Sequence, residues 1–319
     1  MTLGPAPEAV SAALPLVETV APVAAPAEVQ DVVPAYESRG VWRLALDVFV
    51  QNRLAVVGVG IFLFLVLFCY VGPLIYQTDQ VNSALANANL APSTAHPLGT
   101  DPNGYDVLGR LMVGGQTSIE VGLSAAVIAT TFGVLYGAVA GFFGGAVDAL
   151  MMRVVDALLA IPQLFLLLFI ATAFTPTILV LILAVALVSW LIPARLIRAE
   201  ALSLRSRDYV QAVTMMGGSG RRIVGRHIVP NAIGTIMVNA TFQVADAILL
   251  VAYLSFLGLG IPPPATNWGN ILGGGVDLIY NGYWWLIYPA GIAIVLAVVA
   301  FNFIGDALRD ALEVRLQRR

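Results

Sequence analysis

Lysine is absent from this 319-residue sequence, and all 16 of its basic residues are arginine. A phosphate-binding P-loop uses a lysine to reach the β- and γ-phosphates of ATP, so the chain carries no standard P-loop. Charged residues make up only 11% of the sequence and apolar residues 59%, whereas soluble domains carry about 25% charged residues. This balance excludes an ordinary soluble domain and indicates a membrane protein.

Cysteine and histidine are also scarce. Cys69 is the only cysteine, which excludes an intrachain disulfide, and its apolar neighbours favour a small buried thiol. His96 and His227 lie far apart, and neither has a partner at the spacing of zinc ligands. We interpret His96, Asp101 and Asp106 as parts of a structural loop. We therefore expect no metal site, no cofactor and no catalytic residue in this chain.

The first residues lack the cationic start and short apolar core of a signal peptide. Residues 1–38 are rich in alanine, valine, glutamate and proline, and the prolines interrupt any helix. We predict a disordered cytoplasmic tail there. Apolar residues recur at helical spacing in 39–53, which predicts a juxtamembrane amphipathic helix. A plain extension of the next helix is the alternative.

Long runs without charge dominate the rest of the sequence, and a bilayer core needs about 20 apolar residues per helix. The uncharged runs are Leu54–Ile75, Val121–Val147, Ala157–Ala194 and Leu278–Gly305, and the run at 232–257 contains only Asp246. The third run is too long for one span, and Pro176, after Phe174 and Thr175, splits it into a hairpin of two helices of about 18 residues each. We expect the last helix to begin near Trp284. The sequence predicts an all-α integral membrane protein with six transmembrane helices.

All the arginines except Arg110 fall on one side of these predicted spans. Positive charge stays on the cytoplasmic side of a membrane. We therefore expect both termini in the cytoplasm and the segments 77–113 and 258–283 outside.

The largest predicted cytoplasmic segment, 195–231, is too polar to lie in the membrane. Asp208–Met216 suits a short helix that Gly217 and Gly218 end, and Ser219 can cap a second helix. A helix–glycine–helix knob suits docking, because small residues such as Ala212 permit close approach and methionines fit an irregular groove.

The stretch DYVQAVTMMGGSGRRIVGRHIVPN at 208–231 resembles the EAA loop of bacterial ABC importer permeases. Gly217 matches the most invariant glycine of that loop, and Ala212-Val213 stands where the family has an alanine pair. HPLGTDPNGYDVLGRLMVGG at 96–115 and LSFLGLGIPPPATNWGNIL at 254–272 resemble segments of the dipeptide, oligopeptide and nickel permeases.

Residues 137–162 and 305–316 resemble the same group, so the likeness covers most of 40–319, and its order is similar to that of the C-type subunit. Two positions depart from the group: Val251 replaces a glutamate that many relatives carry, and Glu313-Val314 replaces an Asp-Pro pair. The resemblance therefore points to the family more strongly than to one solute.

The resemblance implies a type I ABC importer permease fold for 54–319 and transport of dipeptides, oligopeptides or related solutes into the cytoplasm by alternating access. It implies four kinds of partner in the bacterial inner membrane: a homologous second permease, two ATP-binding subunits that hold ATP and magnesium, an extracytoplasmic solute-binding protein and the lipid bilayer. No nucleic acid is expected, and ATP hydrolysis belongs to the partner subunits. The residues that the resemblance assigns to the ATPase contact are Tyr209, Val210, Ala212, Val213, Met216, Gly217 and Ser219.

Three features keep two interpretations each. Asp246 lies mid-helix, where a charge costs on the order of 2.5–3.5 kcal/mol, so it faces the pathway or forms a structural pair. Gly133, Gly137 and Gly141, four apart, form a static packing face or a sliding one. Asp148, Arg153 and Asp156 form a local ion pair that holds a turn, or they also touch the ATPase.

A secondary transporter or channel that needs no ATPase is the alternative function. Such proteins often contain inverted repeats and midplane charges. The sequence has no clear internal repeat, and Asp246 is its one deep charge.

Overall fold

The computed structural model describes Gly4, Leu46 and residues 48–317, with side chains up to Leu312. The predicted tail at 1–38, apart from Gly4, and most of the predicted amphipathic helix at 39–53 lie outside these residues, so both stay predictions. Residues 48–51 are helical, and the Asn52 side chain accepts a hydrogen bond from the Leu54 amide at the start of the next helix. Regular structure in the described part is helical throughout, which confirms the all-α class.

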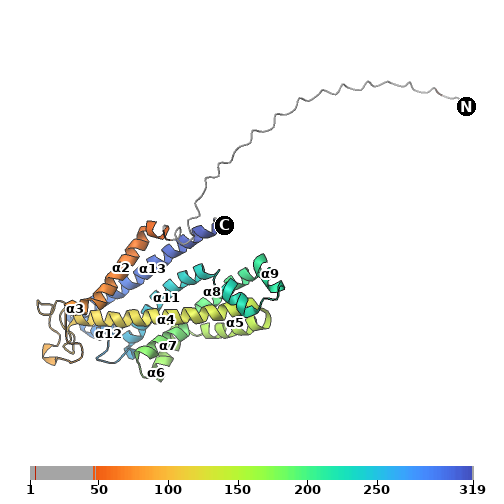
Figure 1. Cartoon of the computed structure of the whole chain (residues 1–319). Helices are drawn as coiled ribbons and strands as arrows, with labels where there is room; N and C mark the ends of the chain where they lie inside the picture. Colours follow the sequence, from red (N-terminus) through yellow and green to blue (C-terminus); the bar gives the residue numbers. More distant parts are fainter. Residues whose placement is uncertain (1–3, 5–45, 47, 318–319) are drawn as a thin grey trace, which may run out of the picture. The chain divides into compact units, whose positions relative to one another are not determined.

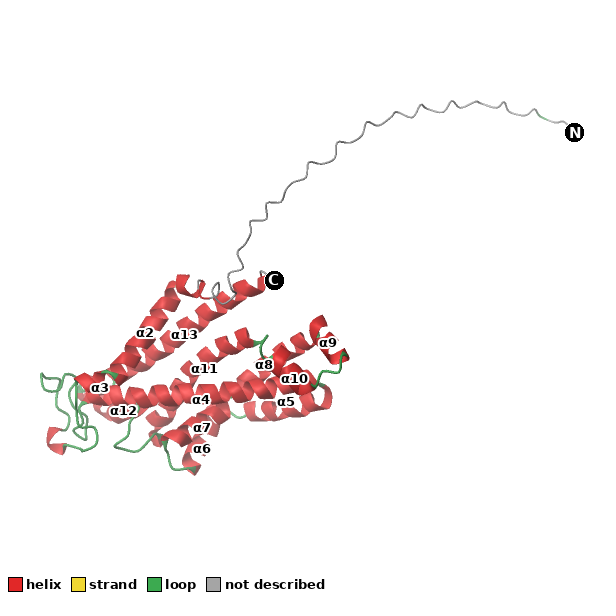
Figure 2. Ribbon diagram, viewed as in Figure 1, coloured by secondary structure: helices red, strands yellow, loops and turns green. Residues whose placement is uncertain are grey.

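Four helices are long and apolar enough to cross a membrane, and two bent pairs raise the number to six if each pair is one span. The four are α2 (Arg53–Tyr70, continued by α3, Gly72–Ile75), α4 (Val107–Phe143), α11 (Ile233–Leu254) and α13 (Tyr288–Gln317). The pairs are α5 (Gly145–Leu159) with α6 (Gln163–Ala173), bent by 82°, and α7 (Ile178–Ser189) with α8 (Leu191–Arg205), bent by 42°. In Figure 1 and Figure 2, α13 packs beside α2, and α4 runs along α8 and α11.

The second predicted helix is shifted. α4 begins at Val107 rather than Val121, because the Asp106 side chain caps it by accepting a hydrogen bond from the Gly109 amide at 2.9 Å. It ends before Gly144, whose φ of +64° no L-residue adopts readily. The prediction from the uncharged run Val121–Val147 therefore left out the first turns of α4. These turns are buried against protein instead of lipid.

The predicted turn of the hairpin is confirmed. α6 ends at Ala173, and Thr177 caps α7 by accepting from the Val180 amide. The predicted lengths are wrong, because α6 has 11 residues and α7 has 12. The chain breaks at Pro162, which has no amide hydrogen for a helix, and bends again at Trp190.

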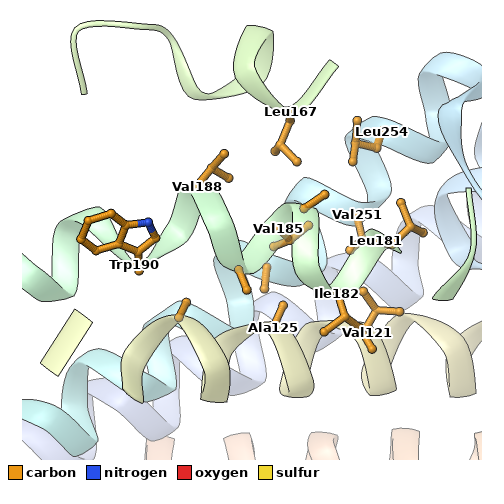
Figure 3. Packing of buried hydrophobic residues seen from close by; sticks show 14 of the residues in the cluster. Val121, Ala125, Leu167, Leu181, Ile182, Val185, Val188, Trp190, Val251 and Leu254 are labelled. Atoms are coloured by element: carbon orange, nitrogen blue, oxygen red, sulfur yellow. The ribbon is translucent and has the colours of Figure 1, made fainter. Parts of the chain in front are cut away.

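The largest cluster of buried side chains lies where α4, α7 and α11 meet (Figure 3). Val121 and Ala125 of α4 face Leu181 and Val185 of α7, and Val251 of α11 completes the contact. Val251 is 1% exposed. The valine that replaces the glutamate of many relatives at this position is therefore an apolar side chain inside the subunit's own core.

α4 and α8 pack so closely that their backbones are in contact. A Cβ added at Gly133, Gly137 or Gly141 would lie only 2.2–2.7 Å from a main-chain oxygen of α8 or of Trp190 directly before it, and the shortest distance joins Gly137 to the Ala194 oxygen. Glycines spaced by four residues permit this approach between helices in a membrane. The glycines thus form a packing surface, which agrees with both interpretations, a static face and a sliding one.

One end of the unit gathers the turns after α4, after α8 and before α11. We call it the α9 end, after α9 (Asp208–Met215). There Gly144 lies beside Arg205, and Gly220 lies beside Phe142. Gly234 of α11 approaches Leu312, which brings the end of α13 to the same side.

The opposite end, which we call the α3 end, holds the loop before α4 against the segments around α12 (Trp268–Gly275). Arg110 donates to the Pro264 oxygen at 2.6 Å, and the Trp268 indole donates to the Leu111 oxygen at 3.0 Å. The Trp285 indole reaches the Thr100 oxygen at 3.4 Å. Three long-range contacts therefore tie this loop and the first turn of α4 to the C-terminal third of the chain.

Asp106 is the centre of the same loop. Besides capping α4, its carboxylate lies 2.9 Å from His96 Nδ1 and accepts from the Tyr76 hydroxyl at 2.8 Å. Burial, the hydrogen bond to Asp106 and the charge of Asp106 raise the pKa of Tyr76 to about 12, so the phenol keeps the proton that it donates. His96 and Asp106 hold a structural loop, as the sequence indicated.

Candidate coupling surface

The segment between α8 and α11 folds into two short helices with a glycine corner. α9 begins after Arg207, whose main-chain oxygen accepts from the amides of Val210 and Gln211. Asp208 stands in its first turn, where a negative charge favours the positive end of the helix. α10 (Gly220–Ile223) follows and continues into a π-helical turn at Val224–Ile228.

Gly217 ends α9 as the sequence predicted. Its φ is +82°, its amide donates to the Thr214 oxygen, and the Gly218 amide donates back to the Val213 oxygen at 3.0 Å. A glycine in this left-handed conformation is a common helix ending. A Cβ added at Gly217 would meet nothing within 4 Å, so the position is restricted by its backbone angle and not by space.

The predicted cap by Ser219 is wrong. Ser219 stands directly before α10, but its side chain forms no capping hydrogen bond. α10 has only four residues and starts with a glycine, so it offers a hydroxyl little regular structure to cap.

Val210 also differs from the other predicted contact residues. It is 1% exposed and packs with Val134 of α4, Ile197 of α8 and Ile223 of α10. Val210 therefore attaches α9 to the helices beneath it and does not face a partner. Val213 is half-buried at the edge of the same cluster.

Five of the predicted contact residues are exposed, and the structure adds one more. Met215 is 84% exposed and Met216 79% exposed. The resemblance assigned only Met216 to the contact, but both methionine side chains project because α9 ends between them. We define the coupling surface as Tyr209, Ala212, Met215, Met216, Gly217 and Ser219.

Positive charge flanks this surface. Arg221, Arg222 and Arg226 are exposed on α10 and the π-helical turn. The ring of Tyr209 lies 6.5 Å from the ring of His227, centroid to centroid, which ties α9 to that turn. The surface therefore offers an apolar patch with a basic border, and this pattern suits a groove with acidic edges.

Two ion pairs connect α8 to α5. Arg198 bonds Asp148 through two nitrogens at 2.5 and 2.6 Å, and Arg195 bonds Asp156. The predicted local pair between Arg153 and Asp156 is therefore wrong, because the Asp156 carboxylate turns to the neighbouring helix. These contacts fix α5 to α8, the helix that precedes the coupling surface in the chain.

Asp246 lies far along α11 from this surface. It is exposed and lines a cavity of about 230 Å³ together with residues of α6, α7 and α8. No ion pair or hydrogen bond to its side chain is found within the described residues, so the structural pair predicted as one alternative is not formed among them.

Comparison with known proteins agrees with this architecture. Residues 133–318 match the family described as the binding-protein-dependent transport system inner membrane component. Residues 40–92 match the N-terminal transmembrane domain of oligopeptide transport permease C. The coupling surface lies inside the first match and α2 inside the second.

Three curated relatives cover most of the chain. The oligopeptide transport system permease protein OppC of Bacillus subtilis is 36% identical over 282 residues, covering 88% of this chain and 92% of the relative. The dipeptide transport system permease protein DppC of the same organism is 37% identical over 268 residues, 84% of each chain. OppC of Escherichia coli is 39% identical over 279 residues, covering 87% and 92%.

These matches do not favour a secondary transporter or channel, and they indicate no enzyme family. They agree with the four to six membrane-spanning helices of the described part. The chain belongs to the binding-protein-dependent transport system inner membrane components, as a C-type permease subunit of an ABC importer.

Proposed function

We propose that this chain carries dipeptides or oligopeptides into the cytoplasm as one half of a permease pair, by alternating access driven by separate ATP-binding subunits. The observation that carries the proposal is the exposed coupling surface at the glycine corner between α8 and α11. The relatives are named as oligopeptide and dipeptide transport permeases, which supports the solute class.

The proposed assembly contains a homologous second permease, two ATP-binding subunits with ATP and magnesium, and an extracytoplasmic solute-binding protein. The absence of lysine, and so of a standard P-loop, means that nucleotide must be bound elsewhere. The family description supports the binding protein. Apolar exposed residues on the spans, such as Phe169 at 71% and Leu187 at 57%, suit lipid or a second permease.

The proposed topology has six spans in the inner membrane with both termini in the cytoplasm. It counts each bent pair, α5 with α6 and α7 with α8, as one span. Arginines support it, because Arg110 is the one arginine at the α3 end among residues 48–317. The α9 end is then cytoplasmic.

In the proposed mechanism, closure of the ATP-binding subunits displaces α9. Val210 passes the displacement to α8, and the glycine face on α4 passes it on, because the two backbones touch. α4 has 37 residues and is about 55 Å long at 1.5 Å per residue, so it reaches from one end of the unit to the other.

The test is a bulky residue at the glycine corner. We expect Gly217→Trp to reduce peptide uptake at least tenfold while the subunit still inserts and assembles, because the change strains only a surface turn. Gly282→Trp is the matched control: Gly282 has a φ of +86°, also has nothing within 4 Å of its Cβ, and lies at the α3 end. Uptake in whole cells, normalised to permease in the membrane, measures both. Wild-type uptake with Gly217→Trp would contradict the coupling role.

A further inference from the structure

A cavity of about 230 Å³ opens beside the middle of α11. Four helices contribute to its wall, and their residues are Gln163, Ser189, Ile192, Gln243, Asp246, Leu249, Leu250 and Tyr253. The break at Pro162 brings Gln163 to the start of α6, and the bend at Trp190 places Ser189 at the end of α7. The two irregular points of the bent pairs therefore meet at one cavity.

Asp246 carries the charge of this cavity. It stands at the centre of the candidate span Ile233–Leu259, where an uncompensated carboxylate is expensive. No basic side chain reaches it within residues 48–312. No described side chain therefore neutralises this carboxylate, which leaves it open to water, to solute or to a neighbouring subunit.

Two further polar groups point to a ligand. Ser189 is 3% exposed, and its hydroxyl has no hydrogen-bond partner, although buried hydroxyls are almost always bonded. Gln243 is 5% exposed and lines the same cavity. The wall thus combines a carboxylate with a hydroxyl and an amide oxygen, both of which accept hydrogen bonds.

This set of groups matches one chemical group. An ammonium has three donors and no acceptor, and a carboxylate, a hydroxyl and an amide carbonyl supply acceptors for all three. The remaining wall comes from the apolar side chains of Ile192, Leu249 and Leu250 and from two further polar residues, Gln163 and Tyr253. The cavity is smaller than the roughly 300–1,000 Å³ of pockets that enclose a whole ligand. It therefore suits one end of a peptide, its amino terminus.

We propose that this cavity is a transit site for the α-ammonium group of a peptide, with Asp246 as its counter-ion and Ser189 and Gln243 as hydrogen-bond acceptors. The proposal rests on the proposed function as a peptide permease. Because every unmodified peptide has the same terminus, the site holds peptides of differing sequence without reading their side chains.

Binding is tested on the purified importer complex without its solute-binding protein. The probes are trialanine and N-acetyl-trialanine at millimolar concentration, and the readout is the thermal stability of the complex. We expect trialanine to raise the melting temperature of the wild-type complex, and the acetylated peptide, which has no ammonium, to leave it unchanged. Asp246→Asn abolishes the shift. Equal shifts with both peptides, or a shift retained in Asp246→Asn, would overturn the proposal.

Transport gives a second readout. In proteoliposomes with saturating loaded binding protein, we expect Asp246→Asn to lower trialanine uptake per ATP hydrolysed about tenfold and Asp246→Glu to restore most of it. Glu120→Gln is the matched control, because Glu120 is an exposed carboxylate on α4 outside the cavity wall. Unchanged uptake in Asp246→Asn contradicts the site.

Two outcomes separate this site from its rivals. Loss of the second permease from the purified Asp246→Asn complex would overturn the proposal by making Asp246 half of an inter-subunit ion pair. Failure of the wild-type complex to transport any peptide would instead refute the proposed function, whatever Asp246 binds.

Discussion

Val210 and Gly217 determine the position and the end of α9, Val210 through its side chain and Gly217 through its backbone. Val210 is buried among α4, α8 and α10, so it sets where α9 sits. Gly217 has open space around it but a left-handed backbone, so it sets where α9 stops. The exposed methionines beside Gly217 then project from a corner that both residues define.

Loss of the Val210 side chain should loosen α9. Val210→Ala removes two buried methyl groups, so we expect α9 to lose roughly 2 kcal/mol of local stability. Hydrogen–deuterium exchange of the amides in 208–216 should then become faster by more than tenfold. Val154→Ala on α5 is the control, because Val154 is 46% exposed. Unchanged exchange with Val210→Ala would mean that α9 is held by other contacts.

Asp148 and Arg198 illustrate why charge placement is hard to read along a chain. Spacing favoured a local pair on one helix, yet the two carboxylates of α5 bond to arginines some 40–50 positions later. A long, flexible arginine reaches across to another helix as readily as along its own. Only the packing of α5 on α8 decides between these partners.

At the scale of helices, the contact between α4 and α8 depends on the absence of side chains. We expect Gly137→Val to destabilise the subunit by about 1–3 kcal/mol or more, since its Cβ would lie 2.2 Å from the Ala194 oxygen. Gly60→Val on α2 is the control, because a Cβ there meets nothing within 4 Å. The measurement is the melting temperature of the purified complex, and equal values for the two variants would contradict close packing.

Local signals in the sequence predicted several helix boundaries. The turn at Phe174–Thr177 and the end of α9 at Gly217 were both found, because proline and glycine act through the backbone of a few residues. α11 was placed within a few residues of Ile233–Leu254 for a different reason, the length of its apolar run.

Other boundaries depend on tertiary contacts and could not be read in this way. α4 starts at Val107 in a segment with Arg110, which is buried because it bonds the Pro264 oxygen from a distant loop. The cavity around Asp246 could not be predicted from the sequence either, since its wall comes from four helices that the sequence does not place together. The sequence found the charged residue but not the groups that surround it.

For the whole molecule, the two ends differ in chemistry. The α3 end is tied together by hydrogen bonds from Arg110, Trp268 and Trp285. The α9 end carries the exposed arginines and the coupling surface. The proposed coupling role therefore belongs to the α9 end, while hydrogen bonds hold the segments of the α3 end together.

This difference leads to a prediction of orientation that the native cysteine makes simple to test. Cys69 is fully buried, so a membrane-impermeant maleimide should not label the unmodified chain. Tyr280→Cys places a thiol at the α3 end, where Tyr280 is 94% exposed, and Gly225→Cys places one at the α9 end without a clash. We expect Tyr280→Cys to react in intact spheroplasts and Gly225→Cys only in inverted vesicles, because the proposed topology places the arginine-rich α9 end in the cytoplasm. The reverse labelling pattern would place the coupling surface outside the cell, where no ATP-binding subunit could reach it.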